Sequence, residues 1–259
     1  MHVFLAPHAD DAPLSCGAYI ATLTARGEAV RIITLMMGNP SPDFKGTAFT
    51  RELEERWEAG VNPYARRRDE DRAAAAILGA QIDFADYPDA AYRADAFGNA
   101  LYPTWEAITT QFNPRDQDLP LKIVQMLAPG ASIANPIPNL TMYFPLGAGG
   151  HVDHRIVRDV GKLLLYHPFI SVRFYEDYPY NFKDQQAVFD ALKSFGNTLI
   201  PRVLPSSEEA IAKKIAAVAC YKSQLSSFWK DELEMNRALR EFTLQHGEIE
   251  WQLPPKEPK

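Results

Sequence analysis

Residues 1–37 read MHVFLAPHADDAPLSCGAYIATLTARGEAVRIITLMM. Within this stretch, residues 2–6 and 29–36 are short, apolar and partly β-branched, which is typical of buried strands. Between them, residues 14–26 have the pattern of a helix that ends at Gly27. The stretch therefore predicts a strand–helix–strand unit, in which two parallel strands are joined by a right-handed crossover.

The same alternation of strands and helices continues along the chain. We expect helices over 49–58, 64–78, 121–127, 152–165, 208–224 and 231–244, and strands over 81–85, 140–146 and 171–176. This order predicts an α/β fold with a Rossmann-like, mainly parallel sheet and helices on both faces. Residues 1–259 form one domain in this interpretation, with an irregular substrate loop over 86–120 and a loose Pro/Lys tail at the C-terminus.

Composition excludes several classes of function. The 259 residues are 46% hydrophobic and 23% charged, which is ordinary for a soluble globular protein. The formal net charge of −6 argues against nucleic acid as a partner, because that binding needs a positive surface. Cys16 and Cys220 have no CxxC spacing, so no disulfide framework or thiolate zinc site is expected.

The chain also has no apolar run of membrane-spanning length. Its N-terminus lacks the basic start and the cleavage site of a secretory signal. We therefore expect a cytoplasmic protein without an integral membrane segment. The sequence leaves the oligomeric state open, a homo-oligomer included.

Three polar residues follow the first predicted strand, and a similar group follows the strand at 140–146. His8, Asp10 and Asp11 form the first group. One interpretation is that the aspartates cap the next helix. In the second group, GAGGHVDHRIVRD at 147–159, His151 and His154 are three residues apart and share a helix face.

The carboxyl ends of parallel strands meet at one edge of a sheet, where such folds bind their ligands. Two histidines and one carboxylate with open water positions are a common catalytic zinc site. A second carboxylate beside such a metal can act as a general base, and a further histidine can stabilise an oxyanion. The two groups therefore predict one catalytic metal centre.

These residues resemble a known family. PHADD at 7–11 and HVDH at 151–154 match the PHxDD and HxDH motifs of the PIG-L/LmbE-like N-acetylglucosaminyl deacetylases. The resemblance implies that His8, Asp11 and His154 bind Zn²⁺, although such ligands also suit Fe²⁺ or another divalent metal. It implies an LmbE-like fold and the removal of an N-acetyl or N-acyl group from a GlcNAc-type sugar or glycoconjugate.

The resemblance also assigns catalytic roles. Asp10 would be the general base, protonated His151 would stabilise the oxyanion, and Asp153 would orient and charge His151. Two alternatives stay open: a non-catalytic metal-binding or sugar-binding protein on the same fold, and a metal-dependent hydrolase of another small amide.

Substrate contacts are expected from Arg68, Asp89 and Arg93. Arg68 could instead lie on a solvated helix face, and Asp89 could simply be a turn residue. One departure from the family concerns position 149, which is glycine here, whereas some members carry a tyrosine that donates to the oxyanion. Tyr178, Tyr180 or a backbone group could take its place.

Overall fold

A computed structural model describes residues 1–57, 62–127 and 137–255 of the chain. In this part of the chain, seven strands form one sheet in the order β3-β2-β1-β4-β5-β7-β6. Strands β3, β2, β1, β4 and β5 are parallel to one another. Strand β7 is antiparallel to its two neighbours, β5 and β6. The strands are β1 (His2–Ala6), β2 (Val30–Thr34), β3 (Gln81–Phe84), β4 (Leu140–Pro145), β5 (Ile170–Tyr175), β6 (Ile200–Val203) and β7 (Ile249–Gln252).

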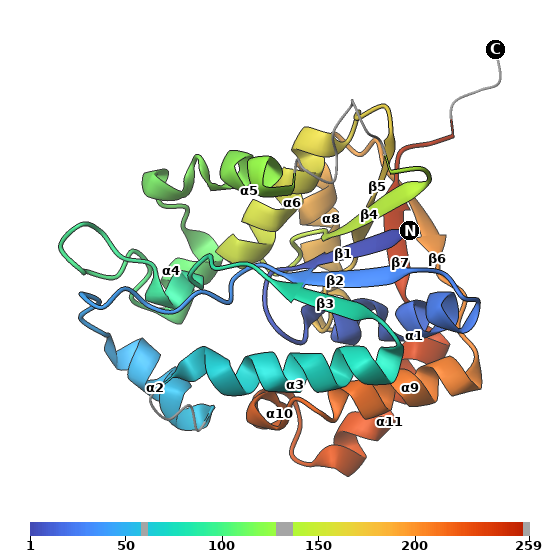
Figure 1. Ribbon diagram of the computed structural model, residues 1–259, viewed down its shortest axis with the longest axis horizontal. Coiled ribbons are helices and arrows are strands. Elements are labelled where there is room, and N and C mark those ends of the chain that lie inside the picture. The colour runs from blue at the N-terminus through green and yellow to red at the C-terminus, as the bar shows by residue number, and fades with distance from the viewer. Residues whose placement is uncertain (58–61, 128–136, 256–259) are drawn as a thin grey trace.

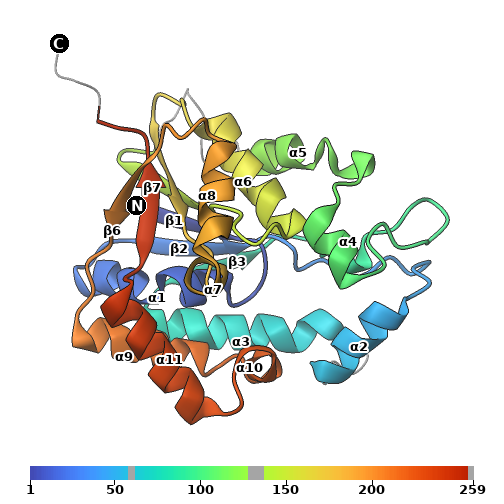
Figure 2. The same cartoon turned by 180° about the vertical axis from the view of Figure 1, so that it is seen from behind.

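Helices cover both faces of this sheet, so the predicted fold class is confirmed (Figures 1 and 2). One layer contains α1 (Asp11–Ala25), α3 (Pro63–Leu78), α9 (Glu208–Val218), α10 (Lys222–Phe228) and α11 (Glu232–Gln245). The other contains α4 (Trp105–Thr110), α5 (Leu119–Leu127), α6 (Val152–Leu164) and α8 (Gln185–Lys193). The remaining helices are the peripheral α2 (Ala48–Arg56), the short α7 (Tyr180–Lys183) and the 3-10 turns η1 (Ala90–Tyr92) and η2 (Pro114–Asp116).

The central strands are apolar because helices bury them on both sides. Helix α1 is also almost wholly buried, since it lies between the sheet and α9. Helix α6 lies close to β4 and β5, where a Cβ on Gly161 would come within 2.6 Å of Phe174 and 2.8 Å of Phe144. Only glycine fits there, and this close packing fixes the helix at its distance from the sheet.

Several boundaries differ from the sequence-based expectations. The irregular 86–120 segment contains α4 and two 3-10 turns, and the helix expected over 208–224 is broken into α9 and α10. The antiparallel strands β6 and β7 were not predicted, because each has only four residues and neither is a continuous apolar run. Most of the predicted loose tail, 256–259, lies outside the described residues.

Strand β1 lies between β2 and β4, so the chain moves to opposite sides of β1 in its two halves. Such a switch point leaves a crevice at the carboxyl ends of the strands, where open α/β sheets bind ligands. Both polar groups of the sequence follow the two strands at this point, β1 and β4. Within the described residues, none of the helices combines the length and apolarity that crossing a membrane requires.

Candidate active site

The turn between β1 and α1 positions the first polar group. Asp10 takes the N-cap position of α1 with a φ of 93°, but its side chain makes no capping hydrogen bond. Instead, the Asp11 carboxylate turns back and accepts a 2.8 Å hydrogen bond from the His8 backbone N–H. The capping interpretation therefore fails for both side chains. A left-handed aspartate is strained, and such strain is concentrated at functional sites.

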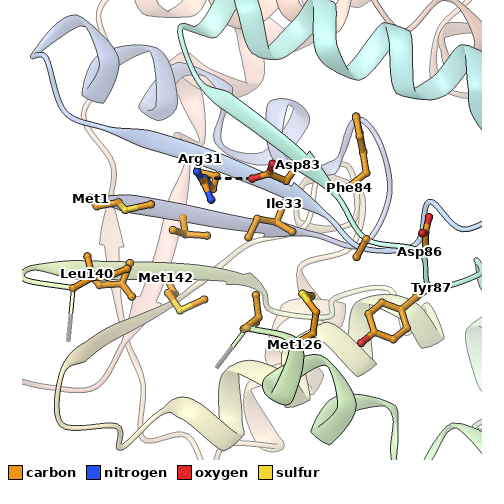
Figure 3. A pocket seen from close by; sticks show the side chains of 14 residues that line it. Met1, Arg31, Ile33, Asp83, Phe84, Asp86, Tyr87, Met126, Leu140 and Met142 are labelled. Carbon is orange, nitrogen blue, oxygen red and sulfur yellow. Dashed lines mark ion pairs between the residues drawn. The ribbon is translucent and has the colours of Figure 1, made fainter. Parts of the chain in front are cut away.

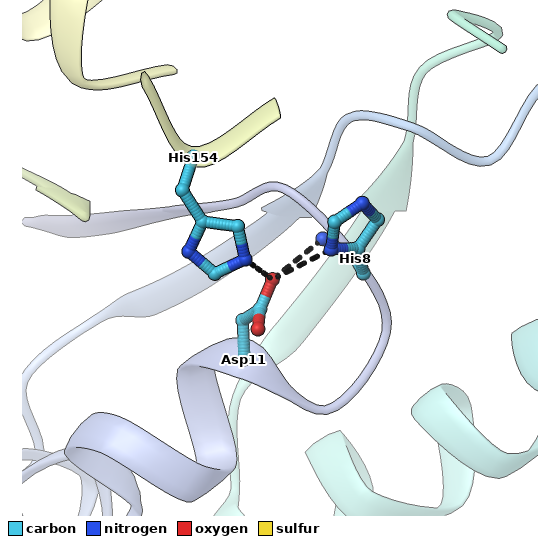
Figure 4. A group of neighbouring side chains, drawn as sticks. All are labelled: His8, Asp11 and His154. Carbon is cyan, nitrogen blue, oxygen red and sulfur yellow. Dashed lines mark hydrogen bonds and ion pairs between the residues drawn. The ribbon is translucent and has the colours of Figure 1, made fainter. Parts of the chain in front are cut away.

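Asp11 lies between two imidazole rings (Figure 4). Its Oδ2 atom is 3.3 Å from His8 Nδ1 and 3.4 Å from His154 Nε2. These distances exceed those of good N–H···O hydrogen bonds. Two ligands of one tetrahedral zinc ion, each about 2.0–2.2 Å from it, lie about 3.3–3.5 Å apart. The three side chains, whose ligand atoms all lie within 4.8 Å of one another, therefore fit a bound metal ion.

The outer nitrogens of both rings are held by carboxylates. His8 Nε2 lies 3.0 Å from Asp153 Oδ2, and His154 Nδ1 lies 2.6 Å from Asp177 Oδ1. Because ionised carboxylates only accept hydrogen bonds, these two nitrogens carry protons. In the neutral rings, His8 Nδ1 and His154 Nε2 are then left with lone pairs on the Asp11 side. Carboxylate–histidine pairs of this kind are usual around metal sites.

Asp177 is a functional residue that the sequence analysis missed. Its second oxygen, Oδ2, accepts hydrogen bonds from the backbone N–H groups of Gly147 (2.8 Å) and Ala148 (3.0 Å). It thereby joins the end of β5 to the turn that precedes α6. The available signal was an acidic residue directly after a predicted strand, at the same sheet edge as the two motifs.

A second group, His8, His151 and Asp153, also has ligand atoms close enough for a metal ion. However, Asp153 already forms an ion pair with Arg93, and this positive charge disfavours a cation at the same carboxylate. Among the residues that the structure describes, Asp11 forms ion pairs with His8 and His154. The electrostatics therefore favour the group that contains Asp11.

Protons compete with a cation for this centre. The pKa values of His8 and His154 are raised, because nearby carboxylates, led by Asp89 for His8 and Asp11 for His154, outweigh the opposing effect of burial. Burial also acts on Asp11, but the two histidines lower its pKa to about 2. A cation between these groups would displace the ring protons, as metal binding at imidazoles does in general.

The pKa of Asp10 is shifted in the opposite direction to that of Asp11. Burial raises its pKa to about 8, although Arg67 opposes the shift from 3.9 Å away. A carboxylate with a pKa near neutrality is suited to accepting and returning a proton. Arg67 also donates a 3.2 Å hydrogen bond to the carbonyl oxygen of Ala9, so the arginine holds the turn that carries Asp10.

His151 lies next to both other histidines, with ring centroids 4.8 Å from His8 and 5.3 Å from His154. Its Nδ1 accepts a 3.2 Å hydrogen bond from the backbone N–H of Asp153. The expected pairing of the Asp153 carboxylate with His151 is not the one found, because that carboxylate binds His8 and Arg93. Burial and the neighbouring His8 keep the pKa of His151 well below its usual value, which disfavours the expected protonated ring in the metal-free protein.

A cavity of about 450 Å³ opens in front of these groups. Its wall includes the aromatic residues Phe49, Trp57, Trp105, Tyr178, Tyr180 and Phe228, which come from or lie beside α2, α4, α7 and α10. Ionisable residues on the wall include His8, Asp10, Asp11, Glu52, Arg56, Arg67, Asp89, His151, His154 and Lys183. A cavity of this size, in which polar groups converge within a largely apolar surface, is typical of small-ligand sites.

The three residues expected to contact substrate have different positions. Asp89 lines the cavity, and it also caps η1 by accepting a 2.9 Å hydrogen bond from the N–H of Ala91. Arg68 does not line it, because its guanidinium donates to the Met37 carbonyl at 2.7 Å. Arg93 is buried behind the site. The structure thus places Arg67, rather than Arg68 or Arg93, beside the cavity.

Another cavity, of about 630 Å³, lies against the sheet near β1 to β4 and α5 (Figure 3). Met126, Met142 and Ile33 contribute to its largely apolar lining, and the Arg31–Asp83 ion pair lies on one side. None of the residues given for its lining belongs to the two motif groups. The chemistry of the molecule is concentrated at the smaller cavity.

The fold and the site together define an α/β enzyme whose buried imidazole and carboxylate groups face a substrate-sized cavity at the switch point of a parallel sheet. The chain belongs to the PIG-L family, described as GlcNAc-PI de-N-acetylase, whose model matches residues 3–164. The resemblance noted from the sequence is thereby confirmed, and the relatives described below include N-deacetylases, which are hydrolases that act on amide C–N bonds.

Individual relatives are similar to this chain over most of its length. The chain is 28% identical over 243 residues to 2'-N-acetylparomamine deacetylase of Niallia circulans, covering 90% of this chain and 83% of that protein. The zinc-inhibited form of the teicoplanin deacetylase Orf2 has a similar structure, with a TM-score of 0.80 at 23% identity, covering 100% and 99% of the two chains.

The 4-carboxy-2-hydroxymuconate hydratase GalB of Pseudomonas putida KT2440 is a more distant structural relative. It matches with a TM-score of 0.55 at 15% identity, over 100% of this chain and 98% of that one. A hydratase on a similar fold demonstrates that the fold alone leaves the reaction open. The reaction has to be argued from the site.

Proposed function

We propose that the protein is a zinc-dependent hydrolase that removes an N-acetyl group from a GlcNAc-type sugar or glycoconjugate, with His8, Asp11 and His154 as the metal ligands. One observation carries the proposal: Asp11 Oδ2 lies between two imidazole nitrogens at separations that suit shared metal ligands and exceed good hydrogen bonds. When bound, the ion supplies Lewis acidity toward the amide carbonyl and lowers the pKa of water.

Asp10 is the proposed general base. It lines the cavity directly beside the ligand Asp11, and burial gives it a pKa of about 8, close to the range in which a base works best. Its carboxylate takes a proton from the attacking water as the oxygen bonds to the acyl carbon. The same proton goes to the sugar nitrogen when the C–N bond breaks, so acetate and a free amine leave.

His151 is the proposed oxyanion donor. Because Nδ1 already accepts the Asp153 backbone N–H, the proton of the neutral ring belongs to Nε2, which is left free to donate. The ring forms part of the cavity wall next to His8. A donor aimed at the developing negative charge is worth about 3–4 kcal/mol of transition-state stabilisation in comparable sites.

Tyr180 is the proposed second donor, in place of the tyrosine that some family members carry at position 149. A Cβ on Gly149 would come within 2.3 Å of the Tyr180 ring, so the ring occupies the space next to this glycine. Gly149 also has a φ of 80°, which favours glycine. The Tyr180 ring is 6.5 Å from that of His154 and lines the cavity, which is the basis for proposing its phenol as a donor to the substrate carbonyl.

The cavity wall supports a sugar substrate. Trp105 is 53% exposed and forms an edge contact with Phe49, so a large aromatic surface is open to a ligand beside His151. Aromatic side chains combine apolar area with specific geometry, which suits the flat face of a pyranose. Asp89, on the same wall, is the proposed acceptor for sugar hydroxyl groups. The paromamine and teicoplanin deacetylases supply the substrate class as an analogy.

The proposal is tested by Asp10→Asn, assayed for bound metal and for acetate release from a panel of N-acetylated amino sugars, glycoconjugates and simple amides. The panel is run with zinc and with Fe²⁺, because one relative is described in a zinc-inhibited form. We expect metal content to stay and turnover to fall about 10²–10⁴-fold. Asp69→Asn, an exposed change on α3, serves as the matched control.

Two results would overturn the proposal. Wild-type turnover in Asp10→Asn would remove the base from the mechanism. A metal-loaded wild-type protein that binds amino sugars tightly but releases no acetate would identify a non-catalytic binding protein, and hydrolysis confined to simple amides would exclude the sugar substrate.

A further inference from the structure

Arg93 is buried between two carboxylates and does not face the cavity. Its side chain is 5% exposed, and it forms ion pairs with Asp153 and, through Nε at 3.0 Å, with Asp116. The guanidinium also lies over the Tyr102 ring, 5.3 Å from the centroid. A side chain surrounded in this way is unavailable to a substrate, so a role for Arg93 has to run through the groups that it contacts.

Asp153 is the partner that leads to the proposed metal centre. Its carboxylate is fully buried, and the two oxygens have separate tasks. Oδ1 pairs with Arg93, whereas Oδ2 lies 3.0 Å from His8 Nε2 and accepts a 2.9 Å hydrogen bond from the N–H of Ala90. The buried guanidinium of Arg93 neutralises this carboxylate and holds Oδ1, so Oδ2 is left in place to accept from His8. Asp153 is thus fixed as an acceptor.

A fixed acceptor at Nε2 decides the tautomer of His8. The proton stays on Nε2, and the lone pair of Nδ1 is directed to the side on which Asp11 lies, 3.3 Å away. If the carboxylate were free to turn, the ring could rotate or carry its proton on Nδ1, and neither arrangement would present a ligand atom. Partners of this kind, which hold a metal-binding histidine from behind, are usually worth 10–100-fold in metal affinity.

The segment expected from sequence to be a substrate loop supplies this support. Arg93 and Ala90 lie at η1, and Asp116 at η2. Tyr102 contacts both ends: its ring lies under the Arg93 guanidinium, and its hydroxyl donates to Asp116 at 2.7 Å and accepts the backbone N–H of Asn113 at 2.8 Å. The loop therefore reaches the His8 ring through Arg93 and Asp153, in addition to placing Asp89 in the cavity wall.

We propose that Arg93 is a positioning residue for the metal centre: it fixes the Asp153 carboxylate, which in turn holds the His8 ring with Nδ1 toward Asp11. The proposal rests on the proposed function, since it assumes that His8 is a metal ligand. It replaces the expectation that Arg93 contacts the substrate. It also couples the folding of the 86–120 segment to metal affinity.

The test compares Arg93→Gln with Arg155→Gln. Arg155 also joins α6 to this segment, by a 3.1 Å hydrogen bond to the Gln111 carbonyl and by its contact with Phe112, but has no bond to Asp153. Metal affinity is measured by competition with a chromogenic chelator, and ligand geometry by the visible absorption spectrum of the Co²⁺-loaded protein. We expect Arg93→Gln to weaken metal binding about 10–100-fold and to alter the cobalt spectrum, with kcat falling more than KM rises. Arg155→Gln should match the wild type.

The outcomes separate the possible failures. Unchanged metal affinity and cobalt spectrum in folded Arg93→Gln would overturn the positioning role, and a raised KM with normal metal affinity would reinstate a substrate contact. If Arg93→Gln does not fold, Asp116→Asn removes the other ion pair of Arg93 and so loosens its hold on Asp153. Metal affinity and the cobalt spectrum of this variant then test the positioning role. Failure of the wild type to bind metal at all would instead contradict the proposed function.

Discussion

Two buried carboxylates lie at helix α1, Asp11 at its start and Glu248, from another part of the chain, beside its middle. Their surroundings differ. Near the middle, Glu248 accepts the backbone N–H groups of Ala18 (3.0 Å) and Tyr19 (2.7 Å) and pairs with Lys214 at 2.8 Å. The two charged side chains are 0% and 1% exposed. At the start, Asp11 faces two imidazoles at distances too long for good hydrogen bonds, beside a cavity.

The difference teaches how to distinguish a structural charge from a functional one. Both regions bury ionisable groups, which is costly unless they are paired. The Glu248 region is closed, since one cation and two N–H groups satisfy the carboxylate. The Asp11 region instead directs ring nitrogens and carboxylate oxygens toward a common point with room for a further atom. Burial alone is therefore no sign of function, whereas convergence beside a cavity is.

The largest expected effect comes from Asp11→Asn, which keeps the shape of the side chain and removes its charge. We expect the bound metal to be lost, because a neutral amide is a poor ligand beside two imidazoles. Turnover should fall at least about a thousandfold, since the ion contributes several kcal/mol to the barrier. Metal analysis and the acetate assay check this, and full metal content in Asp11→Asn would contradict the ligand assignment.

The matched change in the other region is Glu248→Gln. It leaves the fully buried Lys214 without its counter-charge, so we expect a loss of about 3–5 kcal/mol in the free energy of unfolding. Metal content per folded chain should not change. Urea unfolding measures the first quantity and metal analysis the second. The double variant Lys214→Met/Glu248→Gln removes both charges and should recover much of the loss; a loss as large as in the single variant would show that the ion pair is not its source.

A smaller effect is expected at Asp71, a buried carboxylate of a third kind. Its two oxygens accept hydrogen bonds from the hydroxyls of Thr34 (2.6 Å) and Tyr221 (2.5 Å). Burial raises its pKa from 3.8 to about 6, although these hydrogen bonds oppose the shift. Between these values the native state binds more protons than the unfolded chain, so this group makes the protein less stable as pH rises.

Raising the pKa of Asp71 from 3.8 to about 6 corresponds to a change of about 3 kcal/mol in the free energy of unfolding. Asp71→Asn should remove it, so the difference in stability between about pH 4 and pH 7 should become smaller by that amount. Urea unfolding of the metal-free protein at the two pH values checks the prediction. An unchanged difference in the variant would mean that Asp71 does not titrate in this range.

Much of the fold could be predicted because its central strands and helices carry strong local patterns. The apolar run at residues 2–6 and the alanine-rich helix that ends before Gly79 are examples. Strands β6 and β7 could not be predicted, since their place in the sheet depends on the pairing of β7 with β5 and of β6 with β7 rather than on their own composition. The order of the strands, which creates the crevice beside β1, matched the expected fold class.

The site divides in the same way. The motif residues His8, Asp11 and His154 were expected together, and they lie together. The role of Arg93 depends on how the 86–120 segment folds back on the motifs, which no local pattern reveals. For Asp177 the position after a predicted strand was a signal, but its pairing with His154 depends on the fold. The sequence alone does not distinguish an arginine that contacts a substrate from one that forms an ion pair with a buried aspartate.

The aromatic wall of the cavity belongs to elements outside the sheet, since Phe49, Trp105 and Phe228 lie on α2, α4 and α10. The proposed metal ligands lie instead just after the C-terminal end of β1 (His8 and Asp11) and in the first turn of α6 (His154). Changes on these helices alter the recognition surface while the elements that carry the proposed metal ligands stay in place. Variation at these three aromatic positions is the natural place to begin redirecting the enzyme toward other acetylated amines, with the 86–120 support left intact.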